Sequence, residues 1–283
     1  MTLRAAPWLP LMLCAALAAC ASRPPVPDWQ GSAQGAAQRA TAAYLAGEDR
    51  VAQAEWARAR AEVARTGRPD LLARLALMDC AAQVASLALQ PPVCERFEAL
   101  RADAPAPERA YAAYLAGRAS AQDAALLPEA HRQALAASGD PATVPSALAA
   151  MADPLARLVA AGALLQAGRA SPAVMALATD TASAQGWRRP LLAWLLARAQ
   201  RAEQAGNVEE AAARTRDAIE RVLPLLNVGH DVLLVAHAHI LRILTSQWLG
   251  VDPHFARLLR LDTAHYCILS QYKGDNVIER WNC

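Results

Sequence analysis

Aromatic residues are scarce in this chain, at 5% of 283 residues with only two Phe, although hydrophobic residues reach 55%. Much of that hydrophobic share is Ala, which is the strongest helix former. An Ala-rich sequence punctuated by Gly is typical of many short, closely packed helices. The length allows one large or two ordinary domains with a sizeable core.

An excess of charge of one sign is also missing. Lys and Arg number 28 and Asp and Glu number 26, which leaves a formal net charge of +2. No basic stripe interleaved with aromatic residues occurs. Electrostatics therefore gives no case for a nucleic-acid partner, and we expect none.

Metal-binding patterns are absent too, because no Cys-x-x-Cys or Cys-x-x-His pair occurs. His237 and His239 lie two residues apart at an expected helix start, where such side chains point in different directions. We predict no metal site and no cofactor. Cys80 and Cys94 flank the turn at 89–92 between two expected helices, which favours a disulfide over two buried free thiols. Such a bridge would contribute about 3 kcal/mol.

The N-terminus has the features of a targeting segment. Arg4 supplies a short positive region, and the apolar stretch at 5–19 is broken by Pro7 and Pro10, so it is too short to span a bilayer as a stable helix. The stretch ends in Leu-Ala-Ala-Cys at 17–20, which resembles the lipobox of bacterial lipoproteins. The alternative is an ordinary signal peptide with a chance Cys.

The resemblance implies a signal peptide at 1–19 and a diacylated Cys20 that anchors the chain to a membrane. Ala21 after Cys20 resembles sorting to an outer membrane. We therefore expect a cell-envelope protein on the periplasmic face of the outer membrane, with protein or envelope partners. Residues 20–36, which contain several Pro and Gly, are expected to form the lipidated Cys and a flexible tether.

Residues 37–206 show a helical pattern throughout, and Gly residues follow the apolar runs as left-handed helix caps would. These Gly residues are Gly47, Gly67, Gly117, Gly139, Gly168, Gly186 and Gly206. The hexapeptide Ala-Ala-Tyr-Leu-Ala-Gly occurs at both 42–47 and 112–117. It resembles a degenerate tetratricopeptide-type hairpin, although the spacing is not that family's 34 residues. We predict a mainly α fold, an irregular helical-hairpin array followed by a small incomplete α/β segment.

Large side chains in this array are expected to fill the core. Trp56, Trp187 and Trp194 are the main ones, and the alternative is that they line a peptide-binding groove. His131 has no partner pattern nearby, so we predict a solvated helix residue.

Residues 207–283 show a different pattern. Asn207 and Glu210 form a capping-box arrangement at the start of a helix. The continuous apolar run Val232–Ala236 predicts a strand buried in a parallel sheet, followed by a helix that ends at Gly250. Alternation at 266–272 and 277–281 predicts a β-hairpin.

Four motifs in this last quarter occur in order: VLLVAHAHILR at 232–242, WLGVDP at 248–253, LRLDTAH at 259–265 and ERWN at 279–282. Together they resemble the second half of the histidine phosphatase (phosphoglycerate mutase-like) superfamily. The resemblance implies that His237 lines a phosphate pocket, that the Ala238 N–H reaches the phosphate, and that Arg242 matches a family Arg. It also implies a nucleophilic His in an Arg-His-Gly motif, and this chain contains no Arg-His-Gly. Without the strand that bears that motif, Val232–Ala236 would keep an unpaired apolar edge, open to aggregation or to docking of another segment.

Three hypotheses for function follow. The first is a lipid-anchored cell-envelope helical scaffold or binding protein with a non-catalytic partial histidine phosphatase domain at 207–283. The second is a phosphomonoester hydrolase that uses His237. The third is a composite reading frame whose C-terminal segment has no selected activity.

Overall fold

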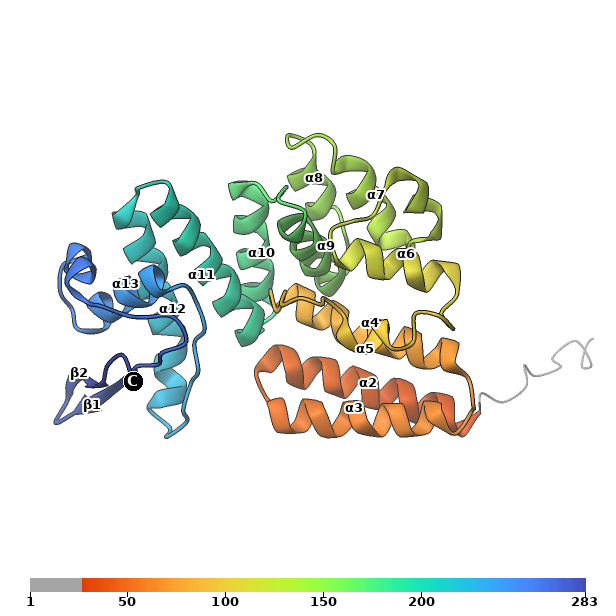
Figure 1. Ribbon diagram of the computed structural model, residues 1–283, viewed down its shortest axis with the longest axis horizontal. Coiled ribbons are helices and arrows are strands. Elements are labelled where there is room, and N and C mark those ends of the chain that lie inside the picture. The colour runs from red at the N-terminus through yellow and green to blue at the C-terminus, as the bar shows by residue number, and fades with distance from the viewer. Residues whose placement is uncertain (1–26) are drawn as a thin grey trace, which may run out of the picture.

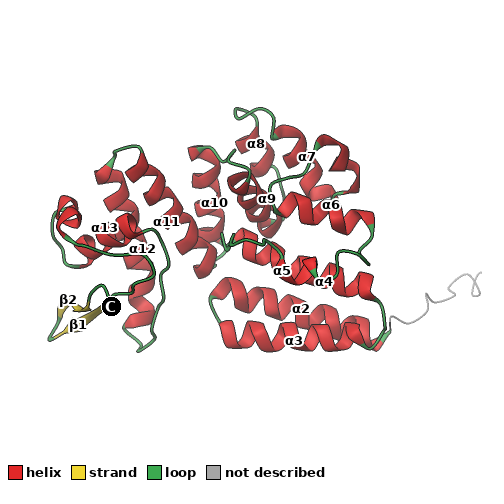
Figure 2. Cartoon of the chain, viewed as in Figure 1, coloured by secondary structure: helices red, strands yellow, loops and turns green. Residues whose placement is uncertain are grey.

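A computed structural model describes residues 27–283 (Figure 1). The expected signal peptide at 1–19, the expected lipid site at Cys20 and the first part of the expected tether lie outside the described residues. The described chain is mostly helical, and its two short strands lie at the C-terminal end (Figure 2). The predicted fold class is therefore confirmed.

The first part, which we call the helical array, comprises residues 28–206 and contains ten α-helices and one 3₁₀ helix. These are α2 (Asp28–Ala46), α3 (Asp49–Ala64), α4 (Pro69–Ala85), α5 (Glu95–Glu98), α6 (Ala106–Leu115), η1 (Ala121–Leu126), α7 (Glu129–Ala137), α8 (Val144–Ala149), α9 (Pro154–Gln166), α10 (Pro172–Ala184) and α11 (Arg188–Gln204).

The second part, the C-terminal region, comprises residues 207–283. Its elements are α12 (Val208–Leu226), α13 (Ala238–Trp248), η2 (Pro253–Leu258), β1 (Ile268–Tyr272) and β2 (Asp275–Arg280). The two strands pair antiparallel as a hairpin. The expected helix from Asn207, the helix before Gly250 and the hairpin are all formed.

The tether prediction is wrong for residues 28–36, which form the first half of α2. Ala33, Ala36 and Ala40 are buried against α3, where Trp56 is only 4% exposed. Small side chains let the two helices approach closely, so burial outweighs the cost of Gly31 and Gly35 within the helix.

Gly residues end most helices of the array as the sequence predicts. Gly47 has φ 85° and its N–H bonds the carbonyl of Tyr44 at 3.0 Å. Gly117, Gly168 and Gly206 also have positive φ. Gly139 is an exception, because α7 ends at Ala137 and Gly139 is not among the positive-φ glycines.

The buried residues form two clusters, a small one between α2 and α3 with Leu75 of α4, and a large one that extends from α4 into α12 and α13. Trp194 of α11 is fully buried in the large cluster. Its Nε1 donates to the carbonyl of Ala85 at the end of α4 at 3.1 Å. Arg188 and Arg189 of α11 donate to the carbonyls of Ala46 and Tyr44 at 2.9 and 2.7 Å. Both carbonyls lie at the C-terminus of α2, where cationic side chains are favourable. These contacts hold the first helix of the array against its last.

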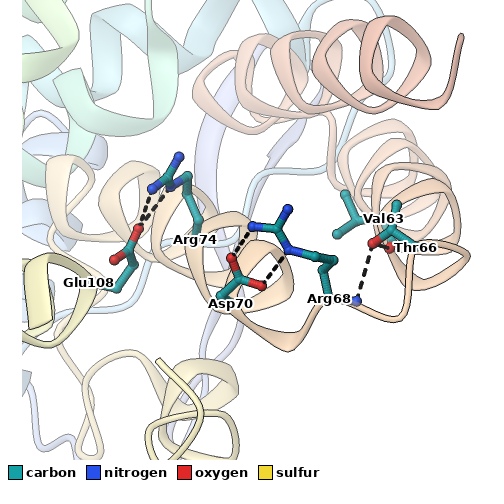
Figure 3. A network of polar contacts seen from close by, with 6 residues as sticks. All are labelled: Val63, Thr66, Arg68, Asp70, Arg74 and Glu108. Atoms are coloured by element: carbon teal, nitrogen blue, oxygen red, sulfur yellow. Dashed lines mark hydrogen bonds and ion pairs between the residues drawn. The ribbon is translucent and has the colours of Figure 1, made fainter. Parts of the chain in front are cut away.

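Helix α4 is held by polar contacts at its N-terminal half and by a disulfide at its C-terminal half. Arg74 donates to Glu108 of α6 at 2.6 and 2.9 Å, while Arg68 forms a two-bond pair with Asp70 (Figure 3). Further along, Cys80 and Cys94 form a disulfide with Cα atoms 5.1 Å apart, as the sequence favoured. Helix α4 is therefore joined to α6 near its start and to the first residue before α5 near its end.

The expected strand at Val232–Ala236 is not formed, which corrects the sequence prediction. Residues 231–237, which we call the 231–237 segment, run as a coil between α12 and α13 (Figure 1). Leu233 and Val235 are 86% and 80% exposed. A strand requires neighbouring strands to pair its backbone, and the described residues supply none beside this segment.

Candidate functional site

His237 lies where the resemblance placed it, directly before α13. It is the N-cap residue, with φ −64° and ψ 146°, and its carbonyl accepts a hydrogen bond from Leu241 at 3.1 Å. Its side chain does not cap the helix and is exposed. The ring has no hydrogen-bond partner among the described residues. Nothing in that part of the chain fixes its tautomer or orients it toward a substrate.

Ala238 is the first residue of α13, so its N–H belongs to the free N-terminal turn of the helix. Such an N–H can donate to an anion. The position supports the phosphate contact that the resemblance implies, but the Ala238 N–H is a single neutral donor on a half-buried residue.

Arg242 is held in a structural role. Its Nη1 donates to the carbonyl of Leu259 at 3.2 Å, and its Nη2 contacts the ring of His239. The Nδ1 of His239 lies 3.7 Å from Glu203 of α11. Arg242 therefore links α13 to the end of η2, rather than pointing its guanidinium with His237 at a common ligand.

Two other His residues of the C-terminal region, His254 and His265, make contacts within local turns. His254 donates its backbone N–H to Asp252 at 2.8 Å, and this bond, followed by the ring contact, lowers the pKa of the Asp252 carboxyl. The Nδ1 of His265 lies 3.0 Å from the carbonyl of Thr263. Neither ring is hydrogen-bonded to His237 in the described structure.

The motifs at 259–265 and 279–282 meet in space. Asn282 accepts from the Asp262 N–H at 2.7 Å and donates to its carboxylate at 3.0 Å. These bonds, with Arg260, lower the pKa of Asp262. This pairing joins the residues after β2 to the residues before β1.

A hollow of about 470 Å³ lies between α12, α13 and the tail. Its walls are mostly apolar and include Ile219, Leu226, Leu234 and Trp248, with His265 at one side. His237 and Arg242 do not line it. The residues that the resemblance assigns to phosphate thus lie outside the main concavity of this region.

A second cluster, which the sequence did not predict, lies inside the helical array. His131 of α7 is 4% exposed, so the prediction of a solvated side chain is wrong. Its ring lies 5.0 Å from that of Tyr114 and 5.4 Å from that of Tyr111, and its Nε2 is 3.4 Å from the Tyr111 hydroxyl. Burial lowers the pKa of His131 to about 4, with Asp153 opposing that shift. Burial also raises the pKa of both tyrosines.

The signal for this burial is present in the sequence but weak. His131, Ala134 and Leu135 follow helical spacing, and Ala134 is buried while Leu135 packs against the same core. A neutral His on that stripe can be buried because its charged form is the one that burial penalises.

No group of three or more His, Cys, Asp or Glu side chains that could hold a metal ion occurs in residues 27–283. Over the same residues, no helix has both the length and the apolar character needed to cross a membrane.

A family model for the histidine phosphatase superfamily (branch 1) matches residues 118–283, more than half of the chain. The chain therefore belongs to this superfamily. The match begins well before the motifs at 232–282 and includes η1 to α11, which are helical in the structure. Comparisons with curated proteins and with solved structures found no match.

Proposed function

We propose that this protein is a lipid-anchored scaffold of the cell envelope that binds partners through its helical array and does not hydrolyse phosphate esters. The observation that carries the proposal is the isolation of His237. A histidine phosphatase needs a nucleophilic His, cationic groups around the phosphoryl oxygens and an acid for the leaving group. The chain has no Arg-His-Gly, and the exposed His237 ring makes no hydrogen bond and no ion pair with another described residue.

Binding by the array is supported by a hollow of about 620 Å³ between α3, α4 and α5. Trp56 and Leu72 give it apolar walls, and Arg60, Asp79 and Arg96 give it charges of both signs. Concave surfaces with apolar walls and a few polar groups are typical binding sites.

The catalytic part is tested by an assay of the purified protein with p-nitrophenyl phosphate. We expect no hydrolysis above the buffer blank, and the same for His237→Ala. The matched control is His254→Ala, which removes another exposed imidazole of the same region. Hydrolysis that His237→Ala abolishes and His254→Ala preserves would establish the second hypothesis, a phosphomonoester hydrolase. That alternative is favoured by family membership and by the free N–H of Ala238.

The anchoring part is tested by labelling cells with a radioactive fatty acid. We expect label on the wild-type chain and none on Cys20→Ala, with the variant released from the membrane fraction. Cys283→Ala is the control, because it removes an exposed thiol at the other end of the chain. Equal membrane retention of wild type and Cys20→Ala would reject the anchor.

The third hypothesis, a composite reading frame, is tested by the mass of the cellular protein. A native chain that includes residues 207–283 is expected on immunoblots with an antibody against the peptide at 248–265. Absence of that epitope from a band detected through the helical array would support a composite frame.

A further inference from the structure

The 231–237 segment has the side-chain alternation of a strand but lacks strand partners. Leu233 and Val235 are 86% and 80% exposed, whereas Val232, Leu234 and Ala236 are half-buried. Leu234 and Ala236 pack against the core, and all five residues border the hollow over α12 and α13. In the described structure, no backbone hydrogen bond involves the N–H or C=O groups of residues 231–236. One face of the segment therefore packs on its own chain, while its backbone is free to pair.

The segment is also nearly symmetric about its centre. If a second copy of the same segment ran antiparallel with Leu234 opposite Leu234, Leu233 would face Val235, and Val232 would face Ala236. All four of these residues are apolar. Each outward residue meets an outward residue and each inward residue meets an inward one, because the side-chain period of a strand is two.

The ends of the segment are complementary in the same register. Asp231 of one copy would lie opposite His237 of the other, and the pair would occur twice because the arrangement is two-fold symmetric. Both side chains are exposed, and neither makes a hydrogen bond or ion pair with another described residue. A carboxylate accepts a hydrogen bond from an imidazole N–H, and every tautomer of His has one. A one-residue shift of register would separate these pairs and place inward residues opposite outward ones.

We propose that the 231–237 segment is a self-association surface, on which a second copy of this chain docks antiparallel through the same segment. The pairing satisfies the free backbone groups and covers part of Leu233 and Val235 by cross-strand contact. It is isologous, so it closes at two copies. A pair of strands this short buries less than the roughly 1,200 Å² of a stable interface, so the dimer depends on concentration.

The first test is sedimentation velocity of the full chain in mild detergent across a broad range of concentration. Wild type is expected to shift from one copy to two. Asp231→His and His237→Asp are each expected to weaken association at least tenfold, because like groups then face each other. The double variant Asp231→His/His237→Asp exchanges the partners and is expected to recover the wild-type behaviour. A merely structural effect of either substitution would not be recovered in this way.

The second test is register-specific cross-linking in a chain that also carries Cys267→Ala and Cys283→Ala. Leu234→Cys is expected to form a disulfide between copies on mild oxidation, because directly opposite residues have Cβ atoms about 5 Å apart. Leu233→Cys is the matched control. It is more exposed, but in this register its copies lie on a diagonal about 7–8 Å apart, so it is expected to cross-link far less.

Wild type that remains a single copy at every concentration would overturn the proposal. So would a single variant that associates as well as wild type, or equal cross-linking at positions 233 and 234. Assemblies larger than two would also contradict it, because an isologous contact closes.

Discussion

The helical array and the C-terminal region distribute their large hydrophobic side chains differently. Twelve large hydrophobic residues are exposed in the described chain, and nine of them lie after residue 207. No residue after Ala256 is buried. The helices of the array bury most of their large apolar side chains on neighbouring helices. The C-terminal region has two α-helices, one 3₁₀ helix, a hairpin and an extended segment, which are too few elements to cover one another.

This difference explains why the array forms almost entirely as expected while the expected parallel strand does not. A helix satisfies its backbone hydrogen bonds within itself, whereas a strand depends on another strand. Without a neighbouring strand, α13 still forms, but residues 232–236 remain a coil. The largest predicted effects of substitution accordingly lie in the array and the smallest in the C-terminal region.

The largest effect is expected for Trp194→Ala. Trp194 is fully buried and its Nε1 bonds Ala85, so truncation leaves a cavity and an unpaired carbonyl. We expect a loss of about 3–5 kcal/mol in the free energy of unfolding. Trp281→Ala, in the half-buried tail, is the control and should cost less. Denaturant unfolding, monitored by circular dichroism, measures both losses. Equal losses would contradict the expected difference between the array and the C-terminal region.

The second effect is a pH dependence from His131. Its folded pKa of about 4 lies below the ordinary value of 6.5, so the unfolded chain binds a proton that the folded chain does not. Stability is therefore lost as pH falls from about 6.5 to about 4, by an amount that these two pKa values place at about 3 kcal/mol. His131→Phe should remove this part of the acid sensitivity, whereas His254→Phe, an exposed position, should not. Melting temperatures at several pH values measure it, and parallel curves for wild type and His131→Phe would contradict the assignment.

A third effect compares two glycines of the array. A Cβ at Gly162 of α9 would overlap the carbonyl of Val84 in α4, so Gly162→Ala should cost about 1–3 kcal/mol. A Cβ at Gly31 of α2 meets nothing within 4 Å, so Gly31→Ala should gain about 0.5–1 kcal/mol from helix propensity. The difference in denaturant midpoint between the two variants measures the closeness of α4 and α9. Equal midpoints would mean that these helices are further apart.

The smallest effect is expected for Leu233→Asp in the C-terminal region. Leu233 is 86% exposed, so at concentrations where the chain is a single copy its free energy of unfolding should change by no more than about 0.5 kcal/mol. Leu45→Asp is the matched substitution in the array, where Leu45 is 2% exposed, and should be severely destabilising. A large loss for Leu233→Asp would show that the 231–237 segment packs more tightly than its exposure indicates.

The parts of the fold that the sequence predicts correctly depend on local signals. Gly47 and Gly117 mark helix ends because positive φ costs other residues more, and Asn207 caps α12 through Glu210 at 3.0 Å. Cys80 and Cys94 are close because a short turn joins their helices.

The parts that fail depend on contacts distant in sequence. His131 of α7 is buried by Tyr111 and Tyr114 of α6. The residues next to His131 in the sequence do not indicate this contact. Residues 28–36 are helical because α3 covers them, although their Gly residues suggest a tether. The position of His237 before a helix was correct, but the loss of the sheet that would surround it follows from the absent neighbouring strands.

The packing of α12 on α11 has one further consequence. Helix α12 buries Ala211, Thr215, Ala218 and Ile219, and α11 is its main neighbour. Helix α12 therefore covers the side of α11 that faces away from the rest of the array. A chain that stopped at Gly206 would expose the outer side of α11 to water. The last 77 residues therefore shield α11 from water, a role that requires no contact with phosphate.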